Sequence, residues 1–435
     1  MTTQRHASAD LPEILSDLGR GPYPEYIDNI LASTARQRQR RVWMLLERWL
    51  PMDLVREPVL SPRLPWRQLS IVAIIVIALI GATFAVLSST PRPLPAPFGP
   101  AANGLIAYEV GGDIYVGNPA SGDARAMVTG PEMDTRPRFS LDGRTVVFGR
   151  DGGDGLVQLY LVGADGSNLR VLTDTPINLL VANVGRGWEA YEFAPDGQSI
   201  LTSIDIHGVA GIGVIDVRTG ALRTLDTTGP VFEPSYRPPD GREILFLGRG
   251  AHTTVSAIDP TTGTVRQIVE LPPMHDVAGA SWSPDGSRIA YWSWSTEFSG
   301  LSARTHIVNA DGTGDRELPM PPEAMWNAHA AWSNDGTRIF TVRGYTADYR
   351  DVRGFVQSAD GSDTGIEVAP TGSVENECCA AWSWSPDDRF LLGRPVAFTG
   401  ARAPQVLVDV EKRKLVPTPW SATSDPTWQR LAPEN

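Results

Sequence analysis

The sequence contains few cysteines, and none of them are separated along the chain. Its 435 residues include two, and these are neighbours, Cys378 and Cys379. Adjacent cysteines exclude a disulfide framework and a zinc site of the CxxC type, because both need spaced pairs. Two interpretations of the pair remain open: a strained vicinal disulfide in an oxidising compartment, or two small buried residues at the start of a strand.

Short catalytic and metal-binding motifs are also missing. The chain has no GxSxG, GxxxxGK[ST] or HExxH segment, and the turn Asp311–Asp315 lacks the residue order of a calcium loop. Six histidines are scattered along the sequence, although His275, Asp276 and His329 are candidates to converge in space. We therefore predict no catalytic residues, no metal and no cofactor, and we expect the chain not to be an enzyme.

Positive charge is scarce relative to negative charge. The chain has 38 Lys and Arg against 50 Asp and Glu. This balance disfavours nucleic acid as a partner, because nucleic-acid-binding surfaces draw their affinity from neutralising phosphates. With 42% apolar residues, 42 glycines and 36 prolines, the composition is that of a folded domain rich in turns.

One long hydrophobic run stands near the N-terminus. Residues 70–89 read SIVAIIVIALIGATFAVLSS, twenty positions without a charge. A helix of this length covers about 30 Å, which is the thickness of the hydrocarbon core of a membrane. We expect a single transmembrane helix here rather than a cleavable signal peptide, because 69 residues precede it.

The charges beside this segment predict its orientation. Eight arginines lie between residues 36 and 67, and only Arg92 follows closely behind the segment. Basic residues favour the cytoplasmic side, so we expect a cytoplasmic N-terminus, a single pass through the plasma (inner) membrane and an extracytoplasmic remainder. The proline-rich residues 90–102 predict an extended spacer.

A short segment then recurs along the chain. It places an aromatic residue before a turn that ends in Asp-Gly or Asp-Asp, and a degenerate seventh copy surrounds Trp428. The aromatics are separated by 54, 43, 46, 50, 52 and 44 residues, which is the size of a four-stranded propeller blade. The copies are Phe139–Gly143, Phe193–Gly197, Tyr236–Gly241, Trp282–Gly286, Trp332–Gly336 and Trp384–Asp388.

The residues between these copies predict four strands per repeat. One strand ends in an Asp-Gly hairpin, a second follows, and a variable loop leads to the aromatic strand, its turn and a fourth strand such as Arg288–Trp294. The repeat region begins with a strand of the fourth kind, Gly104–Val110, and its last strand is an aromatic strand. Joining these ends completes one blade and removes exposed sheet edges. We predict an all-β, seven-bladed β-propeller over residues 103–435, with six blades as the alternative.

These turns resemble those of the TolB-like, tryptophan-aspartate-repeat-like propellers of bacteria. The resemblance covers about residues 103–432 and implies a propeller that binds proteins or ligands. The predicted seven blades differ from the six of TolB itself, and no second TolB domain is recognisable. We also expect no hydrolase domain after the propeller of the kind that propeller peptidases append.

Alternating strand direction places the short Asp-Gly turns on one face of the propeller and the variable loops on the other. We interpret the repeated aspartates, glycines and aromatics as structural. Variable loops on a rigid scaffold usually carry binding residues, so we expect a protein, peptide or glycan ligand at the loop face. The candidate binding residues are Arg186, Trp188, His275, Asp276, Trp326, His329, Tyr345, Asp348, Tyr349, Glu375 and Glu377.

The segment before the hydrophobic run has apolar residues at helical spacing from Leu11 to Leu18. Helices this short do not bury a core alone, so residues 1–48 are expected to dock on the membrane or on a cytoplasmic protein. The layout of residues 1–69, one span and an outer domain resembles that of transmembrane anti-sigma factors.

Taken together, the sequence predicts a membrane-anchored, non-catalytic propeller that binds a protein or ligand at the cell envelope. Two alternatives remain open. The first is a transmembrane signal regulator, and the second is a propeller enzyme with a metal in its channel.

Overall fold

The computed structural model describes Ile75, Val76 and residues 98–432, except for 154, 175, 179–190, 207, 228, 298–301, 348–350, 370–380, 395–405, 417 and 419–425. The chain divides into two units, residues 1–90 and 91–435, and the second of these contains the strands. The expected membrane segment, residues 70–89, lies outside the described residues apart from Ile75 and Val76. Within the described part of the chain, no helix has the length and apolar character needed to cross a bilayer.

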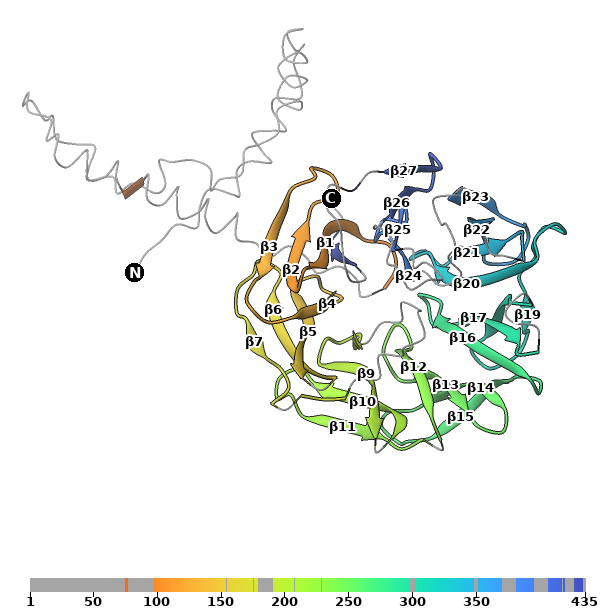
Figure 1. Cartoon of the computed structure of the whole chain (residues 1–435), viewed down its shortest axis with the longest axis horizontal. Helices are drawn as coiled ribbons and strands as arrows, with labels where there is room; N and C mark the ends of the chain where they lie inside the picture. Colours follow the sequence, from red (N-terminus) through yellow and green to blue (C-terminus); the bar gives the residue numbers. More distant parts are fainter. Residues whose placement is uncertain are drawn as a thin grey trace, which may run out of the picture. The chain divides into compact units, whose positions relative to one another are not determined.

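The second unit contains seven four-stranded antiparallel sheets that stand as blades around a ring (Figure 1). Blade I combines one C-terminal strand with three N-terminal strands, and blades II to VII each use four consecutive strands. The chain runs through each blade from the axis of the ring to its rim.

From the axis outward, blade I consists of β28 (Thr427–Leu431), β1 (Ala102–Val110), β2 (Asp113–Gly117) and β3 (Ala124–Val128). Blade II consists of β4 (Asp134–Phe139), β5 (Thr145–Gly153), β6 (Leu156–Gly163) and β7 (Arg170–Val171). Blade III consists of β8 (Tyr191–Phe193), β9 (Ser199–Ile206), β10 (Val209–Asp216) and β11 (Leu222–Leu225).

Blades IV and V consist, in the same order, of β12 (Val231–Tyr236), β13 (Ile244–Arg249), β14 (Thr253–Ile258) and β15 (Val265–Glu270); and β16 (His275–Trp282), β17 (Arg288–Ser295), β18 (Arg304–Asn309) and β19 (Arg316–Glu317).

Blades VI and VII consist of β20 (Trp326–Trp332), β21 (Arg338–Gly344), β22 (Val352–Ser358) and β23 (Ile366–Ala369); and β24 (Ala381–Trp384), β25 (Phe390–Arg394), β26 (Val406–Asp409) and β27 (Lys414–Val416).

The aromatic strand comes first in its blade, not third as the sequence suggested. β16 to β19 form one sheet, whereas β15 and β16 belong to different sheets. The predicted division of the repeat is therefore wrong by half a blade. The physical reason is the length of the connections. A short hairpin joins neighbouring strands of one blade, whereas the longer, variable connection leads from the outermost strand of one blade to the innermost strand of the next.

Blade I closes the ring with strands from both ends of the sequence. β28 pairs antiparallel with β1, which places Trp428 opposite Ile106 and Thr427 opposite Ala107. Trp428 and Ile106 are both buried, in a cluster that also contains Leu392 and Leu407 of blade VII. The predictions of seven blades and of a blade shared by both ends are confirmed.

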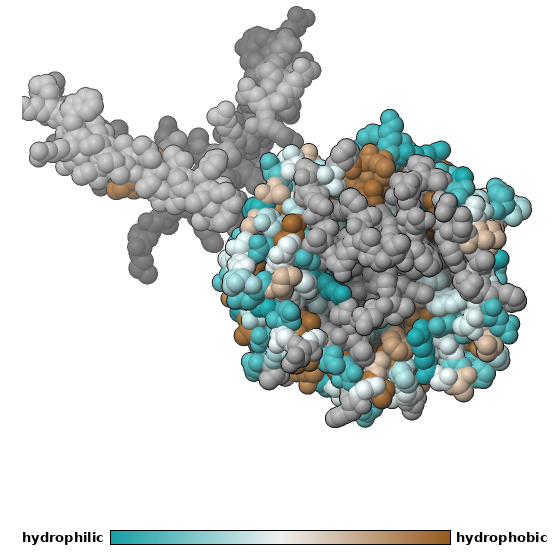
Figure 2. Space-filling model, in the orientation of Figure 1, coloured by the Kyte–Doolittle hydropathy of each residue, from teal (hydrophilic) through white to brown (hydrophobic). Residues whose placement is uncertain are grey.

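Apolar side chains fill the spaces between blades. One cluster joins Trp292 of blade V, Phe340 of blade VI and Leu391 of blade VII, all of them buried. Another joins Leu247 of blade IV to Tyr291 of blade V. Because each blade covers its neighbour, burial of apolar surface stabilises the ring as a whole. The rim in view is mainly hydrophilic, with hydrophobic residues scattered across it (Figure 2).

The Asp-Gly turns have a local structural role. In blade V the Asp285 carboxylate accepts hydrogen bonds from the Ser283 hydroxyl at 2.6 Å and from the Ser287 amide at 3.0 Å. Gly286 has φ +67°, and a Cβ there would lie 2.1 Å from the carbonyl oxygen of Pro238 in blade IV. The turn thus needs glycine both for its backbone angle and for its close approach to the next blade.

An arginine of the preceding blade holds three of these turns, in a contact that we call the arginine–tryptophan latch. The guanidinium carbon lies 4.9 to 5.0 Å from the centroid of the tryptophan ring. The same guanidinium donates to a carbonyl oxygen of the turn at 2.9 to 3.2 Å. The three latches are Arg237 with Trp282 and Gly286, Arg288 with Trp332 and Gly336, and Arg338 with Trp384 and Asp388.

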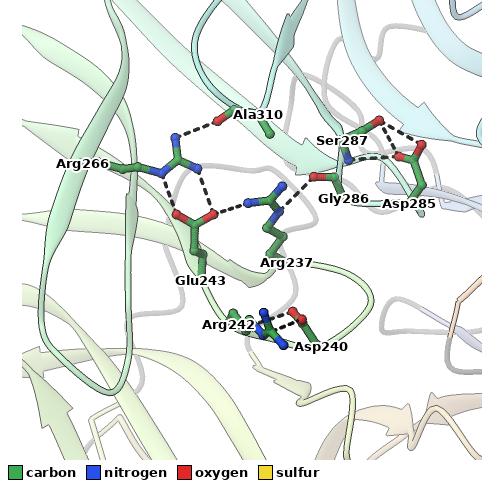
Figure 3. Close-up of polar contacts among 9 residues, drawn as sticks. All are labelled: Arg237, Asp240, Arg242, Glu243, Arg266, Asp285, Gly286, Ser287 and Ala310. Carbon is green, nitrogen blue, oxygen red and sulfur yellow. Dashed lines mark hydrogen bonds and ion pairs between the residues drawn. The ribbon is translucent and has the colours of Figure 1, made fainter.

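Figure 3 shows how Glu243 orders the latch between blades IV and V. Its carboxylate accepts two hydrogen bonds from Arg266, at 2.6 and 2.9 Å, and one from Arg237 at 2.5 Å. Arg266 also donates to the carbonyl oxygen of Ala310 in blade V at 2.7 Å. The hydrogen bonds from Arg266, together with those from Arg237, hold the pKa of Glu243 below its usual value against the opposing effect of burial.

We predict that Glu243→Gln lowers the free energy of unfolding at pH 7 by about 2 kcal/mol, because two arginines lose a shared charged acceptor. The folded-state pKa of Glu243 is depressed, so its contribution is present above the unfolded-state pKa and is lost as the pH falls through the folded-state value. The difference between parent and variant should therefore shrink as the pH is lowered to about 3. Urea denaturation at both pH values measures it.

Arg242→Ala is the control, since this side chain is 84% exposed in its ion pair with Asp240 and should leave the unfolding midpoint unchanged. Equal losses in the two variants would contradict the role given to Glu243.

Candidate functional site at the loop face

Five of the predicted binding residues lie within the described part of the chain. His275 and Asp276 begin β16, Trp326 begins β20, His329 lies within β20, and Tyr345 follows β21. They belong to blades V and VI and gather where the connections from rim to axis enter the innermost strands. The remaining candidates, Arg186, Trp188, Asp348, Tyr349, Glu375 and Glu377, lie outside the described residues, as do Cys378 and Cys379.

The innermost strands of four blades carry a β-bulge at the same place. Each bulge interrupts the pairing with the second strand and contains a residue of positive φ: Arg136, Glu233, Gly279 or His329. Such bulges bend a strand and redirect its side chains. The ring of His329 consequently stacks on Trp292 of blade V, with the ring centroids 5.8 Å apart.

Trp326 is a core residue. Its side chain is 1% exposed, and a Cβ on Gly344 would lie 2.0 Å from its ring. The tryptophan thus fills the space above a glycine of the neighbouring strand and does not line an open surface. The sequence placed it in a loop because the variable connection precedes it, whereas the structure begins β20 at this residue.

Asp276 forms an ion pair across two blades. Its carboxylate lies 3.0 Å from a guanidinium nitrogen of Arg249, at the end of β13, and that guanidinium lies 4.8 Å from the ring centroid of Phe232. The Nδ1 atom of His275 lies 3.1 Å from the carbonyl oxygen of Pro273. The partners of these two residues are therefore not His329, and the described residues contain no group of three metal-ligating side chains.

Tyr345 lies beside an arginine–carboxylate ion pair, as Phe232 does. The Arg353 guanidinium lies 4.6 Å from its ring centroid and donates to the Asp351 carboxylate at 2.7 and 2.8 Å. Burial raises the pKa of Tyr345, and the positive charges of Arg343 and Arg353 oppose that shift. The loop face of blade VI thus offers a phenol, a cation and a carboxylate together.

Blade II carries a third set, which the sequence patterns did not predict. Arg150 donates to both oxygens of Asp134 at 2.6 and 2.8 Å and lies 4.4 Å from the ring centroid of Tyr160. The Asp134 carboxylate raises the pKa of Arg150, mainly through its hydrogen bonds. An arginine in the loop-face half of the second strand, as at Arg150 and Arg249, is the sequence signal that would have identified these positions.

In blade V, a hydroxyl, an imidazole and a carboxylate lie next to one another. The Ser293 hydroxyl lies 3.3 Å from Nε2 of His306, and Nδ1 of His306 lies 3.6 Å from a carboxylate oxygen of Asp315. Tyr291 stacks on the imidazole and donates to the other oxygen of Asp315 at 2.8 Å. Pairing of β17 with β18 places Tyr291 opposite His306, and the sequence alone does not reveal this register.

No family model matches the chain. A curated relative is the uncharacterized peptidase YuxL of Bacillus subtilis (strain 168), which is 24% identical over 185 residues, 41% of this chain and 24% of that protein. The chain therefore spans about a quarter of the length of this relative.

The similar solved structures are propellers. An oligogalacturonate lyase of Vibrio parahaemolyticus is 18% identical, covers 74% of this chain and 91% of its own, and has a TM-score of 0.54. A prolyl endopeptidase is 14% identical, with 78% and 51% covered and a TM-score of 0.51. The TolB of Acinetobacter baumannii is 16% identical, with 76% and 81% covered and a TM-score of 0.47. At these identities the likeness concerns the fold alone. The predicted seven-bladed β-propeller is confirmed by the seven sheets of the structure, and the two solved structures with TM-scores above 0.5 agree with it.

Two expectations from the sequence are contradicted. The relative is named a peptidase, and the similar solved structures include a prolyl endopeptidase and an oligogalacturonate lyase, which opposes both the non-catalytic interpretation and the conclusion that the chain is not an enzyme. The error has a physical cause. Both expectations relied on the absence of short catalytic motifs, but residues on separate strands of a sheet come together without any such motif.

Proposed function

We propose that this propeller belongs to an enzyme that hydrolyses peptides, and that its loop face receives the substrate. The peptidase name of the curated relative supports the reaction class. The loop face supports the substrate class, because arginine, carboxylate and aromatic groups lie together there in blade II, between blades IV and V, and in blade VI. Such groups suit the charges and amides of a peptide chain.

The observation that carries the proposal is the order of groups in Ser293, His306 and Asp315. The hydroxyl faces Nε2 of the imidazole, and the carboxylate faces Nδ1, as in a serine nucleophile with its base and orienting acid. Burial raises the pKa of Asp315, but His306 and the Tyr291 hydroxyl outweigh that effect and hold the pKa below its usual value. The carboxylate is therefore ionised at neutral pH, as the orienting acid of such a set must be.

The proposed reaction follows from this order. The Ser293 oxygen attacks the peptide carbonyl carbon while Nε2 of His306 takes the hydroxyl proton, and the imidazolium then protonates the leaving amine. Water, deprotonated by the same nitrogen, cleaves the acyl ester and restores the serine. Distances of 3.3 and 3.6 Å must shorten for this, as catalytic hydrogen bonds often do when substrate binds. Ser293 is 7% exposed, so blades IV and V must part locally to admit a substrate.

We predict that the purified full-length chain cleaves peptides, as read by mass spectrometry, and that Ser293→Ala lowers the rate by about a thousandfold or more, because the nucleophile is lost. His306→Gln should have a similar effect. Ser295→Ala is the matched control, since this serine lies two residues along the same strand and is 8% exposed. Absence of cleavage by the parent, or equal rates in the parent and Ser293→Ala, would contradict the proposal.

We further propose that residues 70–89 anchor the chain in the plasma membrane, with the propeller outside the cytoplasm. The uncharged run and the arginines before it support this orientation. Protease added to cells stripped of their outer layers should digest the propeller and leave a protected N-terminal fragment. Digestion of the propeller only after lysis would contradict the orientation.

A further inference from the structure

Blade VI buries polar atoms that have no hydrogen-bond partner among the described residues. Five such side-chain nitrogen and oxygen atoms belong to four residues of this blade, Asn327, Thr341, Arg343 and Gln357, which we call the polar seam. Each such atom costs about 1 to 3 kcal/mol when left unsatisfied, so their concentration in one place requires an explanation.

The seam contains a buried positive charge. Arg343 is fully buried, and its terminal nitrogens donate to the Thr364 carbonyl oxygen at 2.5 Å and to the Gln357 side-chain oxygen. Both partners are neutral, and no carboxylate of the described residues lies within ion-pair distance. Burial lowers the pKa of Arg343 to about 10, which Tyr345 and Asp363 only partly oppose. The guanidinium therefore stays charged at neutral pH inside the protein.

Strand register places the four side chains on one surface of blade VI. Asn327 of β20 lies opposite Arg343 of β21, and Thr341 shares that surface two residues earlier. The Gln357 side chain reaches the same guanidinium from β22. This surface faces blade V, because Ile339, two residues before Thr341 on the same surface, packs against Ala290 and Ile307 of blade V.

The unpartnered atoms define the chemistry of a ligand. Four of them are hydrogen-bond donors: Nε of Arg343, the amide nitrogens of Asn327 and Gln357, and the Thr341 hydroxyl. A carboxylate offers about four lone-pair sites and one negative charge, which matches four donors and one cation. The fifth atom, the Asn327 side-chain oxygen, is an acceptor and suits an N–H group next to the carboxylate. The C-terminus of a peptide has both features, whereas a simple carboxylic acid has only the first.

We propose that the polar seam between blades V and VI binds the C-terminal carboxylate of a peptide. This assignment rests on the proposed function and specifies which end of the peptide substrate is bound. Ser293 and the seam lie on opposite sides of blade V, since Tyr291 and Ala290 alternate along β17 and pair with His306 and Ile307. Ser293 and the seam side chains are all buried, so binding of a peptide requires blade V to part locally from both of its neighbours.

The test measures binding by isothermal titration calorimetry on the full-length chain. The Ser293→Ala background separates binding from cleavage. The probes are acetate, N-acetyl-tetraalanine with a free C-terminus, and the same peptide with a C-terminal amide. We expect acetate to bind weakly and the free acid to bind at least about tenfold more tightly than the amide, because only the acid supplies the charge that Arg343 lacks.

Asn327→Leu should reduce this preference while the chain stays folded, because the carboxylate loses one donor and the removed side chain leaves no hydrogen-bond partner unsatisfied. Arg343→Met should abolish the preference, and Arg242→Ala, on an exposed turn, should retain it. Circular dichroism and the unfolding midpoint verify that each variant is folded.

Two results would overturn the assignment. One is equal affinity for acid and amide in the parent background, as expected if only water occupies the seam. The other is a preference for the acid that is undiminished in a folded Asn327→Leu chain. The cleavage assay tests the proposed function separately, so the two can fail independently.

Discussion

The structure depends on the pairing of β28 with β1. A propeller blade buries its faces only when it has a neighbour on each side, so an open ring would expose two apolar faces and two rows of unpaired backbone groups. The last strand of the described chain supplies the innermost strand of blade I, and Trp428 packs there beside Ile106. Closure fixes the angle between all blades, and through it the positions of the loop-face groups that no single blade brings together.

The turn face and the loop face of the propeller differ in whether their side-chain contacts repeat from blade to blade. On the turn face, aspartates, glycines and the arginine–tryptophan latches repeat from blade to blade, because each turn must meet the next in the same way. On the loop face the groups differ: Asp276 is held by Arg249, Asp134 by Arg150, and Arg343 by neutral partners alone. The repeated contacts of the turn face stabilise the scaffold, and the loop face presents different polar groups in different blades.

The sequence predicted the number of blades, the shared blade and the sides on which turns and loops lie. These follow from local signals, namely Asp-Gly turns and aromatic spacing. The division between blades was not predictable in the same way, because it depends on which strands share hydrogen bonds. Trp326 was assigned to the loop face for its place in the sequence, and its burial against Gly344 reflects packing. Ser293 with His306, and Asn327 with Arg343, meet through strand register, which leaves no mark in the spacing of residues.

Hydrogen exchange of the β1 amides tests the closure of the ring most directly. The comparison is between the full-length chain and a chain that ends at residue 426, without β28. Ile106 and Ala107 pair with Trp428 and Thr427, and their amides point to opposite neighbouring strands. We expect the amide of this pair that points to β28 to be protected in the full-length chain and to exchange rapidly in the shortened one. Unchanged protection of both amides after removal of β28 would show that the ring does not depend on this strand.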